Sequence, residues 1–293
     1  MPKVSVVMCC YNSERYIKET IDSVLGQTFT DFEFIIWNDG STDSTENIIL
    51  GYSDERIKYF KDINRGEGLA AQLACSHVSA PYISRIDSDD VWLPGILSEE
   101  YDYMESHPET VLISCPVLYI DADSKVFKRI FLATRTDYLK KSIDRGNCFV
   151  HSGAMYRTEI YLKVGGYSDV RLIQDHLLFK KMSKYGDLAL LKKPYVKYRM
   201  LPNSVAHRVD NSPYRDIIEL FHNKIIKDNG TNEDDLHMLN LIYNKIRADN
   251  TGEVDFYKLD FQNRLFLFMR KFLGEEIANR IIVYLKNLLS YML

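Results

Sequence analysis

The chain has 293 residues, of which 46% are hydrophobic and 27% charged, and its formal net charge is −4. This length and composition suit one substantial α/β domain with a smaller appendage. The net negative charge gives no reason to expect nucleic-acid binding, because a protein surface that binds the phosphates of a nucleic acid normally has an excess of basic residues. Nucleotide binding therefore has to be argued from local residues.

Neither the cysteines nor the first residues indicate an exported protein. The cysteines form no CxxC pair and have no histidine spacing typical of zinc sites, so we interpret them as buried, reduced thiols; they are Cys9, Cys10, Cys75, Cys115 and Cys148. The short apolar run at the start ends at Asn12 to Glu14, too early for a signal peptide or a membrane span. These observations predict a cytoplasmic protein.

The first half alternates short apolar runs with amphipathic helical patterns, which is typical of strands joined by helices into a parallel sheet. Strands are expected at Val4 to Cys10, Phe32 to Trp37, Ile57 to Phe60 and Tyr82 to Ile86. Helices are expected at Tyr16 to Gln27, around Ile48 and Ile49, around Leu69 to Val78, and from near Pro94. Each of these strands ends in a polar loop.

The pattern changes from Val111 onwards. Strands are predicted at Val111 to Leu118, Val126 to Phe131 and His151 to Tyr156, which indicates an antiparallel or mixed extension of the sheet. A short helix is expected to end at Gly165 and Gly166, and the next to run from Asp175 to Lys184. Beyond Asn211 the pattern is almost entirely helical, so we predict a first domain at 1–210 and a helical region at 211–293.

Acidic residues follow the predicted strands of the first half. In an open parallel sheet, ligands bind beyond the carboxyl ends of the strands. Here those positions hold Tyr11 and Asn12, residues 38–43, and residues 87–90. Carboxylates at one edge repel one another and any phosphate unless a cation lies among them, so we predict a hard metal ion that bridges carboxylate and diphosphate. Asp89 is our choice of metal ligand.

Several segments together resemble the family 2 glycosyltransferases. They span about residues 3 to 205 and are VSVVMCCYN at 4–12, NDGSTD at 38–43, RIDSDD at 85–90, HSGAMYR at 151–157, VGGYSD at 164–169, QDHLLFKKM at 174–182 and YRMLPNSV at 198–205. The resemblance implies the GT-A fold, a Rossmann-like open mixed sheet flanked by helices, here with a C-terminal helical extension. It also implies transfer of a sugar from a nucleotide-diphosphate sugar to an acceptor hydroxyl with inversion.

The resemblance assigns donor-binding roles to matching residues. Asp39 would accept a hydrogen bond from the base, which favours UDP-sugar or dTDP-sugar over CMP-sugar because uracil and thymine offer an imide N–H. Asp87 would contact the ribose, Asp89 would bind Mn²⁺ or Mg²⁺, and Asp90 would help to shape the loop. Further candidates on the donor side are Tyr11, Asn12, Arg65, Arg85 and Ser88.

The resemblance makes Asp175 the catalytic base, which removes the proton of the acceptor hydroxyl. Gln174 stands where the family usually has glutamate, so the resemblance does not decide whether this chain makes the acceptor contacts of that glutamate. Gln174, His151 and His176 are candidates for acceptor contacts, and a structural role is equally open for the two histidines.

Simpler interpretations exist for each acid. Asp39 and Asp43 both lie where an aspartate can cap a helix, and we keep that interpretation for Asp43 alone. The acids at 87–90 could form a solvated turn, and we favour a metal site because they directly follow a predicted buried strand. The string Asp121-Ala122-Asp123 is interpreted as a hairpin turn.

The remaining simple interpretations concern Asp175 and two arginines. Asp175 could stabilise the start of its helix, a role that is compatible with catalysis. Arg65 and Arg85 could help a leaving diphosphate or could form ordinary ion pairs.

Two other functions are alternatives to the transferase. One is a non-catalytic nucleotide-sugar-binding or assembly module of a polysaccharide system, which Gln174 favours. The other is a sugar-phosphate nucleotidyltransferase, which would need a glycine-rich phosphate loop after the first strand, and CCYNSERYI at 9–17 lacks one. The resemblance implies a setting in surface polysaccharide synthesis, either capsule or O-antigen.

Residues 255–293 contain two amphipathic patterns whose charges interrupt the apolar face well short of the ~20 apolar residues of a membrane span. Packing within the protein or against a partner subunit is one interpretation, and peripheral membrane contact at the inner face of the cell membrane is the other. The acceptor would be a glycan or a lipid-linked molecule, and a lipid-linked acceptor would suit the second interpretation. The sequence does not indicate an oligomeric state.

Overall fold

The computed structural model describes residues 1–130, 136–143, 149–170 and 172–201, and residues 222–240 apart from 224, 228, 234 and 238. The described strands are β1 (Val4–Cys10), β2 (Phe32–Asp39), β3 (Ile57–Asp62), β4 (Tyr82–Asp87), β5 (Val91–Trp92), β6 (Thr110–Ser114), β7 (Val117–Ile120), β8 (Val126–Arg129), β9 (Ala154–Arg157), β10 (Asp187–Leu190) and β11 (Val196–Arg199). The helices are α1 (Ile17–Leu25), α2 (Thr45–Leu50), α3 (Glu67–Cys75), α4 (Ile96–Ser106), α5 (Thr136–Ser142), α6 (Thr158–Lys163) and α7 (Gln174–Met182).

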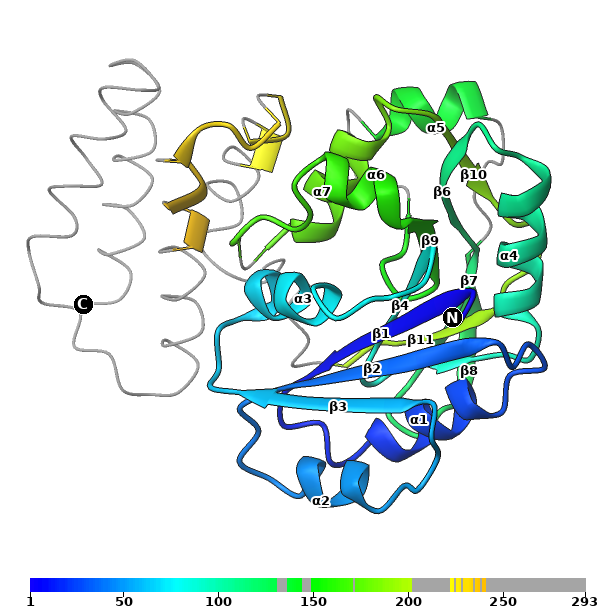
Figure 1. Ribbon diagram of the computed structural model, residues 1–293, viewed down its shortest axis with the longest axis vertical. Helices are drawn as coiled ribbons and strands as arrows, with labels where there is room; N and C mark the ends of the chain where they lie inside the picture. Colours follow the sequence, from blue (N-terminus) through cyan, green and yellow to red (C-terminus); the bar gives the residue numbers. More distant parts are fainter. Residues whose placement is uncertain are drawn as a thin grey trace, which may run out of the picture. The chain divides into compact units, whose positions relative to one another are not determined.

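The larger sheet has seven strands in the order β10-β6-β9-β4-β1-β2-β3 (Figure 1). Strands β1 to β4 run parallel, as the alternation of apolar runs and helices predicts. Strand β9 is antiparallel to both β4 and β6, which confirms the predicted mixed extension. The carboxyl ends of β1, β2 and β4 therefore lie at the same edge, where the predicted site residues follow them.

Helices cover both faces of this sheet (Figure 1). On one face Val6 of β1 packs in the same cluster as Ile21 of α1, and on the other Val7 of β1 packs with Ala71 of α3. Successive side chains of a strand point to opposite faces, so a strand covered on both sides needs apolar residues throughout. This explains the nearly continuous apolar run of β2.

A second sheet has four strands in the order β5-β11-β7-β8. The single strand predicted at 111–118 is wrong, because it is two strands, β6 and β7, that belong to different sheets. Pro116 lies between them, and proline has no backbone N–H to donate to a neighbouring strand. The strand predicted from His151 begins only at Ala154, since residues 151–153 form a turn in which Gly153 has a φ of 90°.

Several sequence predictions fall partly or wholly outside the described residues. Cys148 and the amphipathic region 255–293 lie outside them, and the boundary near 210 stays a prediction. The other four cysteines are free thiols as predicted, and three of them are buried, whereas Cys9 is half-buried. Within the described part of the chain, no helix has the length and apolar character needed to span a membrane.

Candidate functional site

The loops after β1 and β2 are joined to each other at the sheet edge. The backbone N–H of Asn12 donates to Ser41 Oγ over 3.0 Å, and Asn12 Oδ1 accepts the N–H of Thr42 over 2.8 Å. Asn12 has a φ of 49°, in the left-handed region that asparagine tolerates better than most residues. The neighbouring Tyr11 is 39% exposed. The two predicted donor-side segments thus form one surface.

Asp39 connects this surface to the start of α3. Its two carboxylate oxygens accept the backbone N–H groups of Arg65 and Gly66 at 2.8 and 2.9 Å, and the residue is only 4% exposed. A carboxylate has about four lone-pair positions, so these two bonds leave acceptor capacity for a base. Arg65 directs its Nε to Asp62 over 2.9 Å. Asp43 accepts the N–H of Thr45 at 3.0 Å just before α2, which is a turn contact, because the residue that precedes the helix is Ser44 and its side chain makes no cap hydrogen bond.

The segment after β4 is fixed by Arg199, which the sequence interpretation did not single out. The backbone N–H of Arg199 donates to Asp90 Oδ1, and its Nε donates to the carbonyl of Asp89; each donor–acceptor distance is 2.7 Å. Ser88 Oγ lies 2.7 Å from Ser13 Oγ, in the loop after β1. Asp90 is buried and shapes the loop, whereas the side chain of Asp89 is half-buried at the edge.

Arg85 lies beneath this edge and is 1% exposed. Its Nη1 donates to the carbonyl of Val7 over 3.0 Å, its Nε donates to His151 Nε2 over 3.2 Å, and its Nη2 lies 3.6 Å from Asp87 Oδ1. The positive guanidinium group therefore attracts the carboxylate of Asp87 from the interior side of the sheet edge.

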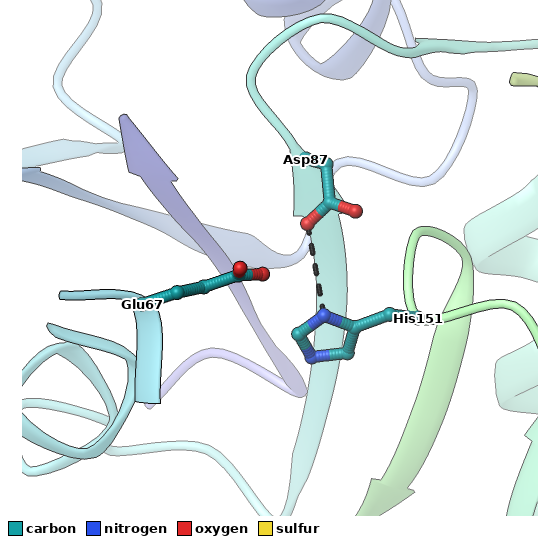
Figure 2. Close-up of side chains that lie close together, drawn as sticks. All are labelled: Glu67, Asp87 and His151. Carbon is teal, nitrogen blue, oxygen red and sulfur yellow. Dashed lines mark ion pairs between the residues drawn. The ribbon is translucent and has the colours of Figure 1, made fainter. Parts of the chain in front are cut away.

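Glu67, Asp87 and His151 form a cluster in which one ligand atom from each lies within 4.8 Å of the others. Figure 2 shows the three side chains pointing toward one another from α3, β4 and the loop before β9. Glu67 was missed in the sequence, where a single acid in the first turn of a helix is fully explained by the helix dipole. The position of that helix start, after a third strand of the same parallel sheet, is the signal that could have found it.

The proton of His151 can be placed from its neighbours. Arginine is always a donor, so the hydrogen bond from Arg85 requires His151 Nε2 to be an acceptor, and a neutral ring then carries its hydrogen on Nδ1. Burial and the positive charge of Arg85 hold the pKa of His151 well below its usual range, which keeps the ring neutral. Nδ1 lies 3.7 Å from Asp87 Oδ1. In this arrangement His151 presents an N–H to Asp87 and offers no lone pair to a cation.

The charges of four acids act on one another at this edge. Burial, followed by the charges of Asp87 and Asp175, raises the pKa of Glu67 to about 8. Burial also raises the pKa of Asp89 to about 6, with Asp87 adding to the effect. Asp175 comes from α7, nearly 90 residues further along the chain, so the fold brings it into the same acidic group. A divalent cation among these carboxylates would relieve the repulsion.

Helix α7 begins with the buried Gln174 and the half-buried Asp175. The next residue, His176, has both ring nitrogens engaged within the protein, with Nδ1 2.8 Å from His222 Nε2 and Nε2 2.7 Å from the carbonyl of Ile143. These contacts favour the structural role for His176. In this segment it is Asp175 whose negative charge raises the pKa of Glu67 in the acidic group.

The stability of the metal-free protein is expected to depend on Glu67. Because its pKa is raised above the value of about 4.3 in an unfolded chain, it stabilises the fold fully below that value and loses this contribution as the pH rises through about 8. In EDTA, the free energy of unfolding should therefore fall less between pH 5 and 8 in Glu67→Gln than in the wild type. Urea titrations at several pH values measure this, and equal slopes would contradict the assignment.

His151 is expected to stabilise the fold through Arg85. His151→Phe would remove the acceptor that Arg85 Nε shares with the Tyr167 hydroxyl, which lies 2.7 Å from His151 Nε2, and this costs about 2 to 4 kcal/mol of unfolding free energy. His151→Gln keeps an acceptor oxygen and should lose clearly less. Equilibrium unfolding in urea compares the two variants, and the same loss in both would show that packing, not this hydrogen bond, is what matters.

Comparison with known proteins identifies the family. The family model for glycosyl transferase family 2 matches residues 5–165, more than half of the chain. The chain belongs to this family. The match includes every donor-side segment described above and ends before α7.

Relatives in this family come from bacteria and archaea. The chain is 33% identical to EpsE of Bacillus subtilis, named as a glycosyltransferase, over 58% of this chain and 62% of EpsE. It is 34% identical to the uncharacterized glycosyltransferase MJ1057 of Methanocaldococcus jannaschii, over 56% of this chain and 58% of that protein. The matched region thus spans about three fifths of the length of these relatives.

Solved structures of two glycosyltransferases share the fold. Residues 1–349 of S. aureus TarS, solved with UDP-GlcNAc, superpose with a TM-score of 0.65 at 20% identity, covering 95% of this chain and 83% of TarS. The mannosyltransferase PcManGT of Pyrobaculum calidifontis, solved with GDP-Man and Mn²⁺, gives a TM-score of 0.59 at 15% identity, covering 98% and 80%. The predicted GT-A fold, an open mixed sheet flanked by helices, is confirmed.

Proposed function

We propose that this family 2 member is an inverting, metal-dependent glycosyltransferase that moves a sugar from a nucleotide-diphosphate sugar, preferably a UDP-sugar, to an acceptor hydroxyl. The observation that carries the proposal is the shared acidic group at the sheet edge. Asp89 follows β4, Asp175 lies in the first turn of α7, and both act on the same half-buried Glu67. A transferase needs these two functions, donor binding and acceptor activation, on adjacent sides of one site.

The donor would lie across the joined loops after β1, β2 and β4. Asp39 keeps acceptor capacity for an imide N–H beside the exposed Tyr11 and Asn12, while Ser88 lies next to the loop after β1. Asp87 would contact the ribose, held in place by Arg85 below it and by the N–H of His151 beside it. Arg85 thus supports the donor site from beneath. Of the two arginines named as donor-side candidates, the exposed Arg65 is the one that would contact the diphosphate.

Asp89 would hold the metal, Mn²⁺ or Mg²⁺. The residues present fit a hard cation, since the half-buried carboxylate of Asp89 has a raised pKa and lies in an acidic group. A bound metal neutralises the charge that develops on a departing diphosphate. Support comes from PcManGT, which has the same fold and was solved with Mn²⁺.

Asp175 would act as the catalytic base. It would take the proton of the acceptor hydroxyl while that oxygen attacks the anomeric carbon from the face opposite the diphosphate. A single displacement of this kind inverts the anomeric configuration. Gln174 is buried beside Asp175 and would orient the acceptor by hydrogen bonds without adding charge.

The setting we propose is surface polysaccharide synthesis in the cytoplasm, at the inner face of the cell membrane, with a glycan or a lipid-linked acceptor. The family resemblance of the sequence motifs is what suggests this setting. We also propose that residues 1–210 form the catalytic domain and residues 211–293 a helical region.

A thermal-shift screen tests the donor class. Because a ligand that binds only the folded state raises its stability with occupancy, UDP-sugars with Mn²⁺ should raise the unfolding temperature more than GDP- or CMP-sugars. UDP-sugar in EDTA is the control for the metal. Stabilisation by GDP-sugars alone would reject the uracil assignment of Asp39.

A further inference from the structure

A hollow lies at the C-terminal end of α7, and none of the residues assigned to the donor lines it. This hollow, called here the lysine pocket, has a volume of about 310 Å³ and is lined by Lys140, Lys180, Ser183, Lys184, Lys227 and Asn229. The lining comes from α5, from the end of α7 and from the segment 222–240. Gly230 of that segment lies against Leu177 of α7, so close that a Cβ on Gly230 would be 2.7 Å from Leu177 Cδ2.

The lysine pocket concentrates positive charge in an acidic protein. Lys140 is paired with Asp187 over 2.6 Å, whereas neither Lys184 nor Lys227 forms an ion pair with any residue that the structure describes. Residues 176–200 contain seven lysines and arginines against one acid, although the whole chain has a net charge of −4. A hollow with this excess of ammonium groups favours an anionic ligand.

Asn229 lies in the wall of the lysine pocket, with its backbone in the left-handed region at a φ of 61°. Its Oδ1 is closed off from solvent and has no hydrogen-bond partner among the residues that the structure describes. A buried polar atom without a partner costs about 1 to 3 kcal/mol. The side chain would therefore gain a hydrogen bond by turning toward a ligand in the lysine pocket.

The helix dipole explains only part of the lysine pocket. Lysines near the C-terminal end of a helix interact favourably with its partial negative charge, which accounts for Lys180 and Lys184. Lys140 and Lys227 come from other segments and converge on the same hollow. The convergence therefore needs a further reason.

We propose that the lysine pocket binds a phosphate group, carried either by a phosphorylated glycan or by an anionic lipid headgroup. Ammonium groups bind phosphate as point charges, and Ser183 and Asn229 supply hydrogen bonds for the neighbouring hydroxyl groups of such a ligand. At 1.5 Å per helical residue, Lys180 lies about 8 Å along α7 from Asp175. A phosphate held here would anchor its carrier on the helix that begins with the proposed base. This site goes beyond the proposed function and does not depend on it.

Residue-resolved acylation of lysines in the intact chain tests the site. The probe is pyrophosphate in EDTA, which removes metal-dependent binding at the acidic edge. Lys184 and Lys227 should be acylated at least about threefold more slowly with the probe, while Lys192 and Lys193 serve as internal controls and should not change. Equal acylation of Lys184 and Lys227 with and without pyrophosphate overturns the proposal.

A charge-reversal variant tests the site by affinity. Lys184→Glu with Lys227→Glu should weaken pyrophosphate binding by about tenfold or more at low salt, whereas Lys192→Glu with Lys193→Glu, an equal change of charge outside the lysine pocket, should not. Unchanged affinity in the first double variant, or an equal loss in both, contradicts the proposal.

Vesicles distinguish the two sources of phosphate. If the source is a lipid headgroup, the wild type should sediment with phosphatidylglycerol vesicles but not with phosphatidylcholine vesicles, and the Lys184/Lys227 variant should lose this binding. If the source is a glycan phosphate, the variant should bind pyrophosphate more weakly while its vesicle sedimentation equals that of the wild type. Sugar transfer to an uncharged acceptor should be normal in either case, so failure of this site is separable from failure of the transferase.

Discussion

Replacing Asp175 by asparagine is expected to lower the rate of sugar transfer by about 10² to 10⁴-fold, the usual contribution of a general base. Asparagine keeps the shape of the side chain and removes the group that takes the acceptor proton. Donor affinity should stay close to the wild-type value because the nucleotide would contact the loops after β1, β2 and β4, whereas Asp175 lies in the first turn of α7. The measurement is the release of UDP in the presence of acceptor, together with the dissociation constant of the UDP-sugar.

The matched control is Glu159→Gln, which neutralises the second residue of α6 just as Asp175→Asn neutralises the second residue of α7. Both changes remove an acid from the first turn of a helix, so any loss from the helix dipole is common to them. Only the Asp175 variant should lose catalysis. A wild-type transfer rate in Asp175→Asn would show that Asp175 is not the catalytic base.

Replacing Asp89 by asparagine is expected to abolish the response of the protein to metal. A metal that stabilises the leaving diphosphate contributes several kcal/mol, so transfer should fall by about 10³-fold or more. Affinity for the UDP-sugar in Mn²⁺ should fall to the value that the wild type shows in EDTA. Titration of transfer rate and donor affinity against Mn²⁺ concentration measures both effects.

Asp123→Asn is the control for Asp89, because Asp123 is the second aspartate of another Asp-x-Asp string. In that string Asp121 Oδ1 accepts the N–H groups of Asp123 and Lys125, both over 3.0 Å, which is the geometry of a turn. The Asp123 variant should respond to Mn²⁺ as the wild type does. A normal metal response in Asp89→Asn would place the metal on other carboxylates.

The sequence predicts the layers of the fold well where each strand is buried on both faces. The predicted bounds of β1 agree with the structure, and those of β2, β3 and β4 differ by at most two residues at their ends. Long apolar runs bounded by polar loops produce this agreement. Strands β5, β10 and β11 have two to four residues each and were missed, because so short a segment carries no periodicity.

The positions of the acids could be predicted, but not the buried groups that support them. The acids follow strands, so the rule for parallel sheets finds Asp39, Asp87 and Asp89. The hydrogen bond from Arg85 to His151 joins residues 66 positions apart in sequence, and the direction of that bond decides which ring nitrogen carries the hydrogen. Residue types and spacing contain no information on such a contact.

The same limit applies to Arg199. Its guanidinium is buried, and it fixes the loop of Asp89 and Asp90 by contacts across more than 100 residues of sequence. From the sequence alone, it was one residue of a family-like segment. Its role follows from strand β11, which pairs with both β5 and β7 and so places Arg199 under that loop.

Calorimetric titration of a UDP-sugar into the wild type, Asp175→Asn and Asp89→Asn, each with Mn²⁺ and with EDTA, tests most directly whether metal-dependent donor binding needs Asp89 and not Asp175. We predict that Mn²⁺ strengthens binding equally in the wild type and in Asp175→Asn, and has no effect on Asp89→Asn. Equal strengthening by Mn²⁺ in all three proteins would contradict the account.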